Sequence, residues 1–179
     1  MRQDPRLGWI PDKPDTRDYI YPYKLRETAL PVQLDLSQVY NVPVVNQGDL
    51  GSCTGNGIAS AIAYLQEKEG AAMRYPSRLF IYYNERVIEG TVNDDAGAEI
   101  RDGIKSVVSQ GYCSEIDWPY DISRFTVKPD ALSYLDASRD LVRTYQKVPV
   151  DANSIMTALA SGYPVIVGFT VYNSFYNQS

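Results

Sequence analysis

The chain has 179 residues, a formal net charge of −5 and no histidine, and 44% of its residues are hydrophobic. This length and apolar content suffice for one folded domain with a real core, while the acidic balance disfavours nucleic acid and anionic membranes as partners. Only Cys53 and Cys113 are present, and neither lies in a CxxC motif, so a disulfide scaffold and a thiolate zinc site are excluded.

The N-terminal arm, residues 1–29, is rich in Pro, Asp and Tyr and shows no periodic pattern, which predicts an extended segment. It has no apolar region of the secretory type, and no later stretch reaches the length of a transmembrane helix. With the low cysteine count, this favours the cytoplasm or a virion interior. Two roles stay open for the arm: Trp9, Ile10 and Tyr19 pin it to the body, or it is a short propeptide over a cleft.

The central feature of the sequence is a glycine-rich turn with a cysteine, followed at once by a helix. Apolar residues at i, i+4 and i+7 predict a buried helix over about residues 54–69, closed by Gly70. Cys53 then lies at the helix N-terminus, where free N–H groups and the helix dipole favour a thiolate. Gln47 offers a side-chain amide that can donate to a developing oxyanion, although a buried structural cysteine remains the alternative.

Two more helices are expected after this one. One starts at residues 75–77 with Pro76 in its first turn, and its apolar face consists of Leu79, Phe80, Tyr83 and Val87. The other is predicted over residues 98–110, with a cap at Gly111 and the inward-facing residues Ile100, Ile104, Val107 and Val108. The acidic residues Asp94, Asp95, Glu99 and Asp102 lack the spacing of a calcium loop and indicate a solvated helix start, so no metal and no cofactor is expected.

The remaining segments are predicted to be strands, apart from one short helix. Strands are expected over residues 141–148 and 164–171, and a short edge strand over residues 42–45. Asp151 is predicted to cap a helix that ends at Gly162 and buries Ile155, Met156 and Leu159. The residues that indicate core packing in the loop before these elements are Cys113, Trp118 and Tyr120.

Residues 30–35, 42–48 and 51–53 together resemble the opening of a papain-like cysteine protease. The resemblance covers about residues 30–179 and implies an α+β, two-lobed fold: a helical lobe around the nucleophile helix and the beginning of a β lobe. It implies that Cys53 is the nucleophile and that Gln47 and the Cys53 N–H form the oxyanion hole. The substrate-binding residues that it implies are Gly51, Ser52, Gly97, Ala98 and Gly168.

The sequence departs from the family pattern at several places. Leu50 stands where the family has a disulfide cysteine, the partner cysteine would fall near Asp94, and Thr54 replaces an aromatic residue. Both halves of that disulfide are therefore missing together, which supports the alignment. The arm also lacks the long helix of the better-known propeptides of this family.

The resemblance implies a thiol protease, a hydrolase that cleaves peptide or protein substrates through a thiolate and an acyl-enzyme. The histidine base and the asparagine of the family have no counterpart in these 179 residues, so we expect them on a further part of the polypeptide or on a second fragment. The alternative is an inactive pseudo-peptidase that serves as a peptide-binding module. A structural or assembly role has no positive support in the sequence.

Overall fold

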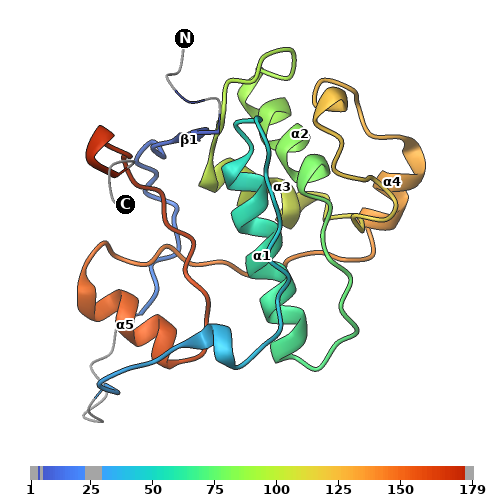
Figure 1. Cartoon of the computed structure of the whole chain (residues 1–179). Helices are drawn as coiled ribbons and strands as arrows, with labels where there is room; N and C mark the ends of the chain where they lie inside the picture. The colour runs from blue at the N-terminus through green and yellow to red at the C-terminus, as the bar shows by residue number, and fades with distance from the viewer. Residues whose placement is uncertain (1–3, 5, 23–29, 176–179) are drawn as a thin grey trace.

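The structure, a computed structural model, describes residue 4 and the ranges 6–22 and 30–175. Parts of the expected arm and the last four residues lie outside this described part. Within it, three helices pack together and form the body of the domain: α1 (Cys53–Lys68), α2 (Arg78–Glu89) and α3 (Ile100–Ser109) (Figure 1). They form the helical lobe that the sequence predicted.

The helix boundaries follow from their caps. The predicted first helix is confirmed within one residue at each end, and Gly70 follows it at a φ of 69°. The start predicted for the second helix is wrong by a few residues: Ser77 is the N-cap, its side chain accepts a hydrogen bond from the Phe80 N–H, and α2 begins at Arg78. Pro76 lies outside this helix in a β-bridge with Ser114.

The third helix starts later than predicted because its first two residues are extended. Ala98 and Glu99 form β2, which pairs in parallel with β1 (Trp9–Ile10), and α3 begins only at Ile100. β1 and β2 are the strands of the described part of the chain, and they form its small sheet. One segment of the arm is thus joined to the helical lobe through backbone pairing.

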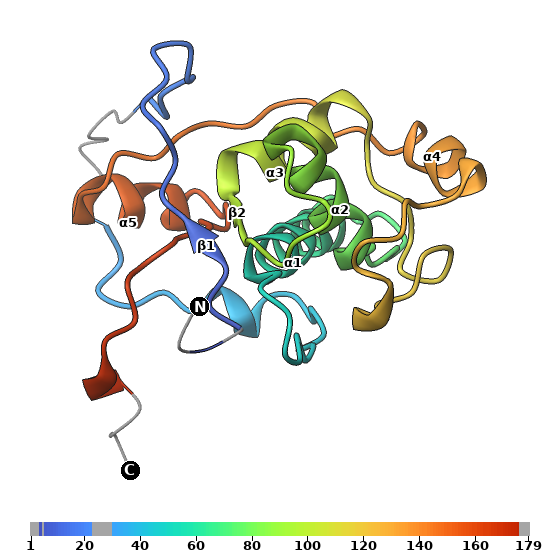
Figure 2. The ribbon, with the colours of Figure 1, turned by 90° about the horizontal axis from the view of Figure 1, so that it is seen from above.

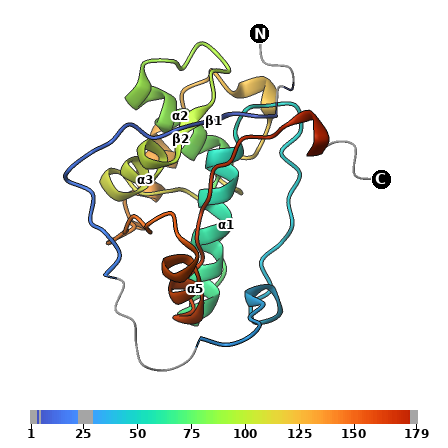
Figure 3. The ribbon, with the colours of Figure 1, turned by 90° about the vertical axis from the view of Figure 1, so that its left-hand side faces the viewer.

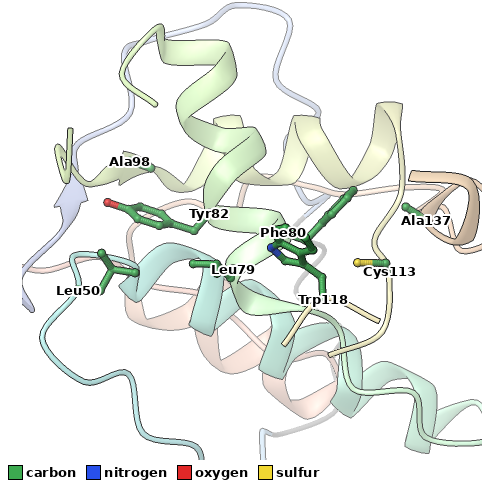
Figure 4. Packing of buried hydrophobic residues seen from close by; sticks show 8 residues of the cluster. All are labelled: Leu50, Leu79, Phe80, Tyr82, Ala98, Cys113, Trp118 and Ala137. Atoms are coloured by element: carbon green, nitrogen blue, oxygen red, sulfur yellow. The ribbon is translucent and has the colours of Figure 1, made fainter. Parts of the chain in front are cut away.

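The core lies on two sides of α2. The first buried cluster, shown in Figure 4, unites residues of the nucleophile turn, α2, β2, the loop after α3 and the segment at residue 137: Leu50, Leu79, Phe80, Tyr82, Ala98, Cys113, Trp118 and Ala137. The second lies between α1 and α3: Ile58, Ala59, Ile62, Ile81, Val107 and Tyr112. Trp118 and Cys113 are core residues as predicted, whereas Val87 is 51% exposed and does not belong to the apolar face of α2.

The second half of the chain differs from the prediction more strongly. The predicted strands over residues 42–45, 141–148 and 164–171 do not form, and the second of them is represented only by a bridge between Ile20 and Lys147. A strand needs hydrogen-bonded neighbours along its length, and the described residues offer these segments isolated bonds, such as those at Lys147, but no continuous partner strand. One helix was not predicted from the sequence: α4 (Ala131–Ala137), whose N-cap Asp130 accepts a hydrogen bond from the Ser133 N–H.

The last helix, α5 (Ala152–Ala160), is confirmed together with its cap, because the Asp151 side chain accepts a hydrogen bond from the Ser154 N–H. Its buried face is not the predicted one: Ser154 and Ala158 are buried, and Met156 is 43% exposed. Short 3-10 turns complete the described chain at η1 (Leu36–Gln38), η2 (Ile122–Arg124) and η3 (Asn173–Phe175).

Candidate active site

Cys53 is the first residue of α1, and the turn before it is buried. Ser52 caps the helix with its backbone only, and both Ser52 and Gly51 are inaccessible to solvent, while the Cys53 residue itself is half-buried. The cysteine therefore lies at the N-terminus of the helix, as the sequence predicted. Figure 3 shows the arm and the C-terminal segment crossing this end of α1.

The expected activation of the thiol is not realised in this arrangement. Burial raises the pKa of Cys53 above its usual value, and a backbone hydrogen bond from Gly8 opposes this shift without reversing it. The backbone N–H groups of Cys53 and Thr54 at the helix N-terminus lower this pKa, in the direction that the sequence predicted, but burial outweighs them. The arm contributes to these surroundings, because Trp9 lines the same cavity as Cys53 and Gly8 bonds to the thiol.

Gln47 lies beside the nucleophile turn, and its amide is occupied. The Nε2 atom donates to the Leu50 carbonyl at 2.6 Å and to the Arg6 carbonyl at 2.9 Å. The first bond belongs to the turn itself. In the second bond, a peptide carbonyl of the arm accepts from the Gln47 amide, which the sequence predicted to donate to the oxyanion of a substrate.

The arm passes through a slot between the nucleophile turn and the turn at Gly97. The Gly8 carbonyl accepts a hydrogen bond from the Ala98 N–H at 2.8 Å, and Trp9 then pairs with Ala98 (Figure 2). A Cβ placed on Gly8 would lie 1.7 Å from the Gly51 carbonyl oxygen, and one on Gly97, at a φ of 81°, would lie 2.0 Å from the Gly8 oxygen. Only glycines permit this approach of three backbones.

Trp9 follows in the slot and meets Gly168 from the C-terminal segment. A Cβ on Gly168 would lie 2.1 Å from Cε2 of the Trp9 ring, so the ring lies directly against the backbone there. A cavity of about 90 Å³ remains beside it, lined by Trp9, Cys53, Thr54, Gly57, Ile100, Ile166 and Val167. The structure thus brings Gly168 to the same face of the lobe as Cys53, Gln47, Gly97 and Ala98.

Further along, the arm is held by charge. Asp18 forms an ion pair of 2.5 Å with Arg101 of α3, and both side chains are largely buried. The Asp12 carboxylate accepts a hydrogen bond from the Arg101 N–H at 3.1 Å, and Lys147 lies 3.4 Å from Asp18. No pattern in the sequence predicted these contacts. The Tyr19 side chain, which was expected to hold the arm, is 74% exposed, and this residue contacts the body through its backbone carbonyl, which accepts a hydrogen bond from the Lys147 N–H at 2.8 Å.

A polar network supports the turn from behind. The hydroxyls of Tyr120 and Ser52 lie 2.5 Å apart, and Tyr120 donates to the Gln47 carbonyl at 2.8 Å. The Arg78 guanidinium stacks on the Tyr120 ring at 3.9 Å and donates to the Asn46 carbonyl at 3.0 Å. Tyr120 was expected only as a core residue, and no local sequence signal marks its second role.

Beneath α1 lies Glu85, a fully buried carboxyl group. It accepts a hydrogen bond from the Thr54 hydroxyl at 2.6 Å, while its Oε1 atom has no partner. Burial raises its pKa well above the usual value.

Among the described residues, no cluster of three or more His, Cys, Asp or Glu side chains has the arrangement of a metal site. No helix in the described chain has the length and apolar character needed to cross a membrane.

The known proteins that are similar to this chain include the following three. A peptidase C1-like protein of Acanthamoeba polyphaga mimivirus is 37% identical over 197 residues, an alignment that takes in 96% of this chain and 63% of that protein. The structure of xylellain, a cysteine protease from Xylella fastidiosa, matches with a TM-score of 0.83 and 39% identity over 90% of this chain and 66% of xylellain. A digestive procathepsin L 3 from the larval midgut of Tenebrio molitor matches in fold, with a TM-score of 0.63 and 18% identity over 87% of this chain and 47% of that one.

No family model matches the sequence. The chain spans slightly less than two thirds of the length of the first two relatives. The likenesses confirm the expected α+β fold, with its helical lobe and few strands. The proposed division at residue 30 and the roles of individual site residues stay predictions.

Proposed function

Since this chain is a papain-like, C1-type protein in sequence and in fold, we propose that it is the part of a cysteine peptidase that carries the nucleophile. The observation that carries this proposal is the neighbourhood of Cys53. Its sulfur lies at the N-terminus of α1, the Gln47 amide of the preceding turn donates to a peptide carbonyl of the arm, and the next part of the arm is hydrogen-bonded to the Ala98 backbone.

The proposed reaction begins when the Cys53 thiolate attacks the carbonyl carbon of a substrate peptide bond. Negative charge then moves to the carbonyl oxygen, where Gln47 Nε2 and the Cys53 N–H donate hydrogen bonds to it. Collapse of this intermediate expels the amine, which takes a proton from the general acid, and leaves an acyl-enzyme. Water hydrolyses the thioester and restores the thiol.

Backbone pairing supports the role of the Gly97–Ala98 segment in substrate binding. The Ala98 N–H donates to the Gly8 carbonyl, a bond that any peptide can form whatever its side chains. We infer that a substrate takes the same donor once the arm has left. Gly51 and Ser52 contribute by shaping the turn, and Gly168 borders the space that Trp9 now fills.

The arm is proposed to act as a short propeptide. Its residues 6–10 occupy the Gln47 amide, the Ala98 N–H and the space beside Gly168, so a substrate cannot reach these groups at the same time. The raised pKa of the Cys53 thiol is consistent with a site that is covered and not activated. The enzyme is therefore proposed to start as a zymogen.

The general base is proposed to be a histidine outside these 179 residues, in a further part of the polypeptide or in a second fragment. Carboxylates are a poor replacement, because their usual pKa of about 4 is far from that of a thiol. Glu85 is no candidate, since it is buried beneath the helix and bonded to Thr54.

The test uses the longest polypeptide that contains this sequence, treated so that the arm is removed. Cleavage of fluorogenic peptides is expected in the wild type and in the matched control C113S, and its complete loss is expected in C53S. If the arm-free protein binds peptides without cleaving them, although Cys53 can be alkylated, the peptidase proposal is wrong and the pseudo-peptidase alternative is correct.

A further inference from the structure

Two side chains connect the nucleophile turn to the Gly97 turn through a continuous set of hydrogen bonds. The Gly51 N–H donates to the Asp95 carboxylate, with distances of 3.0 and 3.1 Å to its two oxygens. The Tyr82 hydroxyl donates to the same carboxylate at 2.5 Å and accepts from the Gly97 N–H at 3.2 Å. The connection therefore runs from Gly51 through Asp95 and Tyr82 to Gly97.

Most of this connection is buried, while Asp95 itself is partly exposed. Tyr82 has no solvent exposure, and Gly51 and Gly97 are also buried. In Figure 4 the hydroxyl end of Tyr82 lies between Leu50 and Ala98, the residues next to Gly51 and Gly97. Burial raises the pKa of Tyr82 strongly, and the hydrogen bond to Asp95 adds to this shift, so the hydroxyl stays a donor at every physiological pH. A buried donor that loses its partner carries the full cost of desolvation.

The two turns joined in this way are the ones that the family resemblance links by a disulfide. That resemblance places the two cysteines at Leu50 and near Asp94, and neither is a cysteine here. Gly51 directly follows Leu50, and Asp95 directly follows Asp94. The bond between Gly51 and Asp95 therefore lies one residue after each of the two cysteine positions. The polar connection thus spans the same two turns by a different chemistry.

We propose that Asp95 and Tyr82 are positioning residues that hold Gly51, and with it Cys53, at a fixed distance from the Gly97–Ala98 backbone. This proposal rests on the proposed function, because the distance matters for a substrate that bonds to Ala98 while Cys53 attacks its carbonyl. The same distance sets the width of the slot through which the arm passes at Gly8. Loss of the connection loosens both the docked arm and the catalytic geometry.

The first experiment uses the chain with its arm and needs no peptidase activity. Wild type, Y82F, D95A and D95N are treated with iodoacetamide, and alkylation of Cys53 and of the buried Cys113 is followed separately by mass spectrometry. Y134F is the matched control, because Tyr134 packs on the same core cluster and donates to Asn84 away from the slot. Cys113 reports general opening of the core.

We expect Y82F and D95A to raise the alkylation rate of Cys53 about tenfold and to leave the rate of Cys113 unchanged. In the Y134F control, both rates are expected to equal those of the wild type. D95N keeps an acceptor oxygen for Gly51 and is expected to restore most of the wild-type rate. An unchanged Cys53 rate in both Y82F and D95A overturns the proposal. A parallel rise at Cys113 also overturns it, since the two residues would then only stabilise the core.

The second experiment measures the arm-free peptidase. Misplacement of reacting groups costs up to about 100-fold in rate, so D95A is expected to lower kcat by about 10- to 100-fold, with D95N closer to wild type and Y134F unaffected. A D95A variant with unchanged kcat overturns the positioning role. If the wild type cleaves nothing, the proposed function fails, and the alkylation result still decides whether the connection holds the slot.

Discussion

The floor and the cover of the candidate site are built in different ways. The floor consists of α1, α2 and the turns joined to them, and its contacts are buried apolar clusters and enclosed hydrogen bonds. The cover is the arm, which is held by backbone pairing at Gly8 and Trp9 and by charge at Asp18. Such contacts can be replaced by water or by another peptide, so the cover can leave while the floor stays folded.

The largest effect is expected where the cover meets the floor at closest range. In G8A the new methyl group would lie 1.7 Å from the Gly51 carbonyl oxygen, so the arm must move out of the slot. Overpacking of this kind costs about 1–3 kcal/mol, or roughly 10- to 100-fold in docking. We expect Cys53 alkylation to rise by that factor, with Cys113 as the internal reference.

The pH dependence of alkylation gives an independent view of the same variant. Burial is the main reason for the raised pKa of Cys53, and the arm is one of the segments packed around this thiol. Removing the arm is therefore expected to lower the pKa and move the alkylation profile to lower pH, with a smaller opposing effect from the loss of the Gly8 bond. An unchanged profile in G8A would mean that the arm does not cover the sulfur in solution.

A smaller effect is expected at the charged end of the cover. Burial alone would raise the pKa of Asp18, but its hydrogen bond to Arg101 and the positive charge there outweigh this, and the pKa is lowered. The ion pair therefore holds the arm at neutral pH and is lost only below about pH 4, as Asp18 takes up a proton. D18N removes the charge at neutral pH and is expected to raise Cys53 alkylation about tenfold.

D15N is the matched control for D18N. Asp15 belongs to the same arm and pairs with the neighbouring Arg17, so its loss removes the same charge without a contact to the floor. Equal alkylation rates in D15N and D18N would mean that overall charge, and not the bond to Arg101, holds the arm.

The smallest effect concerns the floor. Its pH dependence is opposite to that of Asp18, because stability is lost as the pH rises. Because the pKa of the buried Glu85 is raised, the folded protein keeps a proton that the unfolded chain releases, and this group costs stability as the pH rises above about 4. E85Q keeps the acceptor for Thr54 and cannot ionise. We expect it to unfold with a flatter pH dependence than the wild type, measured as Tm between pH 4 and 8, and to leave Cys53 alkylation within about twofold.

The sequence predicted the floor better than the cover, for reasons visible in single residues. The helix after Cys53 and the Asp151 cap depend on local spacing and local hydrogen bonds, which a sequence displays directly. The pairing of Gly8 with Ala98 joins residues 90 positions apart and depends on backbone shape, so no local pattern reports it. The same holds for Asp95, which was seen only as part of an acidic helix start.

The predicted strands failed for a related reason. Residues 164–171 have the composition of a central strand, but strand formation needs a neighbour, and the neighbours are not among the described residues. Ile166 packs against the α1–α3 cluster instead, and Phe169 stays 59% exposed. Composition predicts what a segment can become, whereas pairing partners decide whether it does.

The covalent attachment of the arm has a consequence for how permanently it blocks the slot. A short tether gives an attached segment an effective concentration on the order of millimolar, so even a weakly binding arm stays docked. The same segment, once severed and diluted to micromolar concentration, would have to bind about a thousandfold more tightly to block as well. A single cut would therefore act as a one-way step, and the strength of the inhibition would reside in the connection to the chain more than in the fit of residues 6–10.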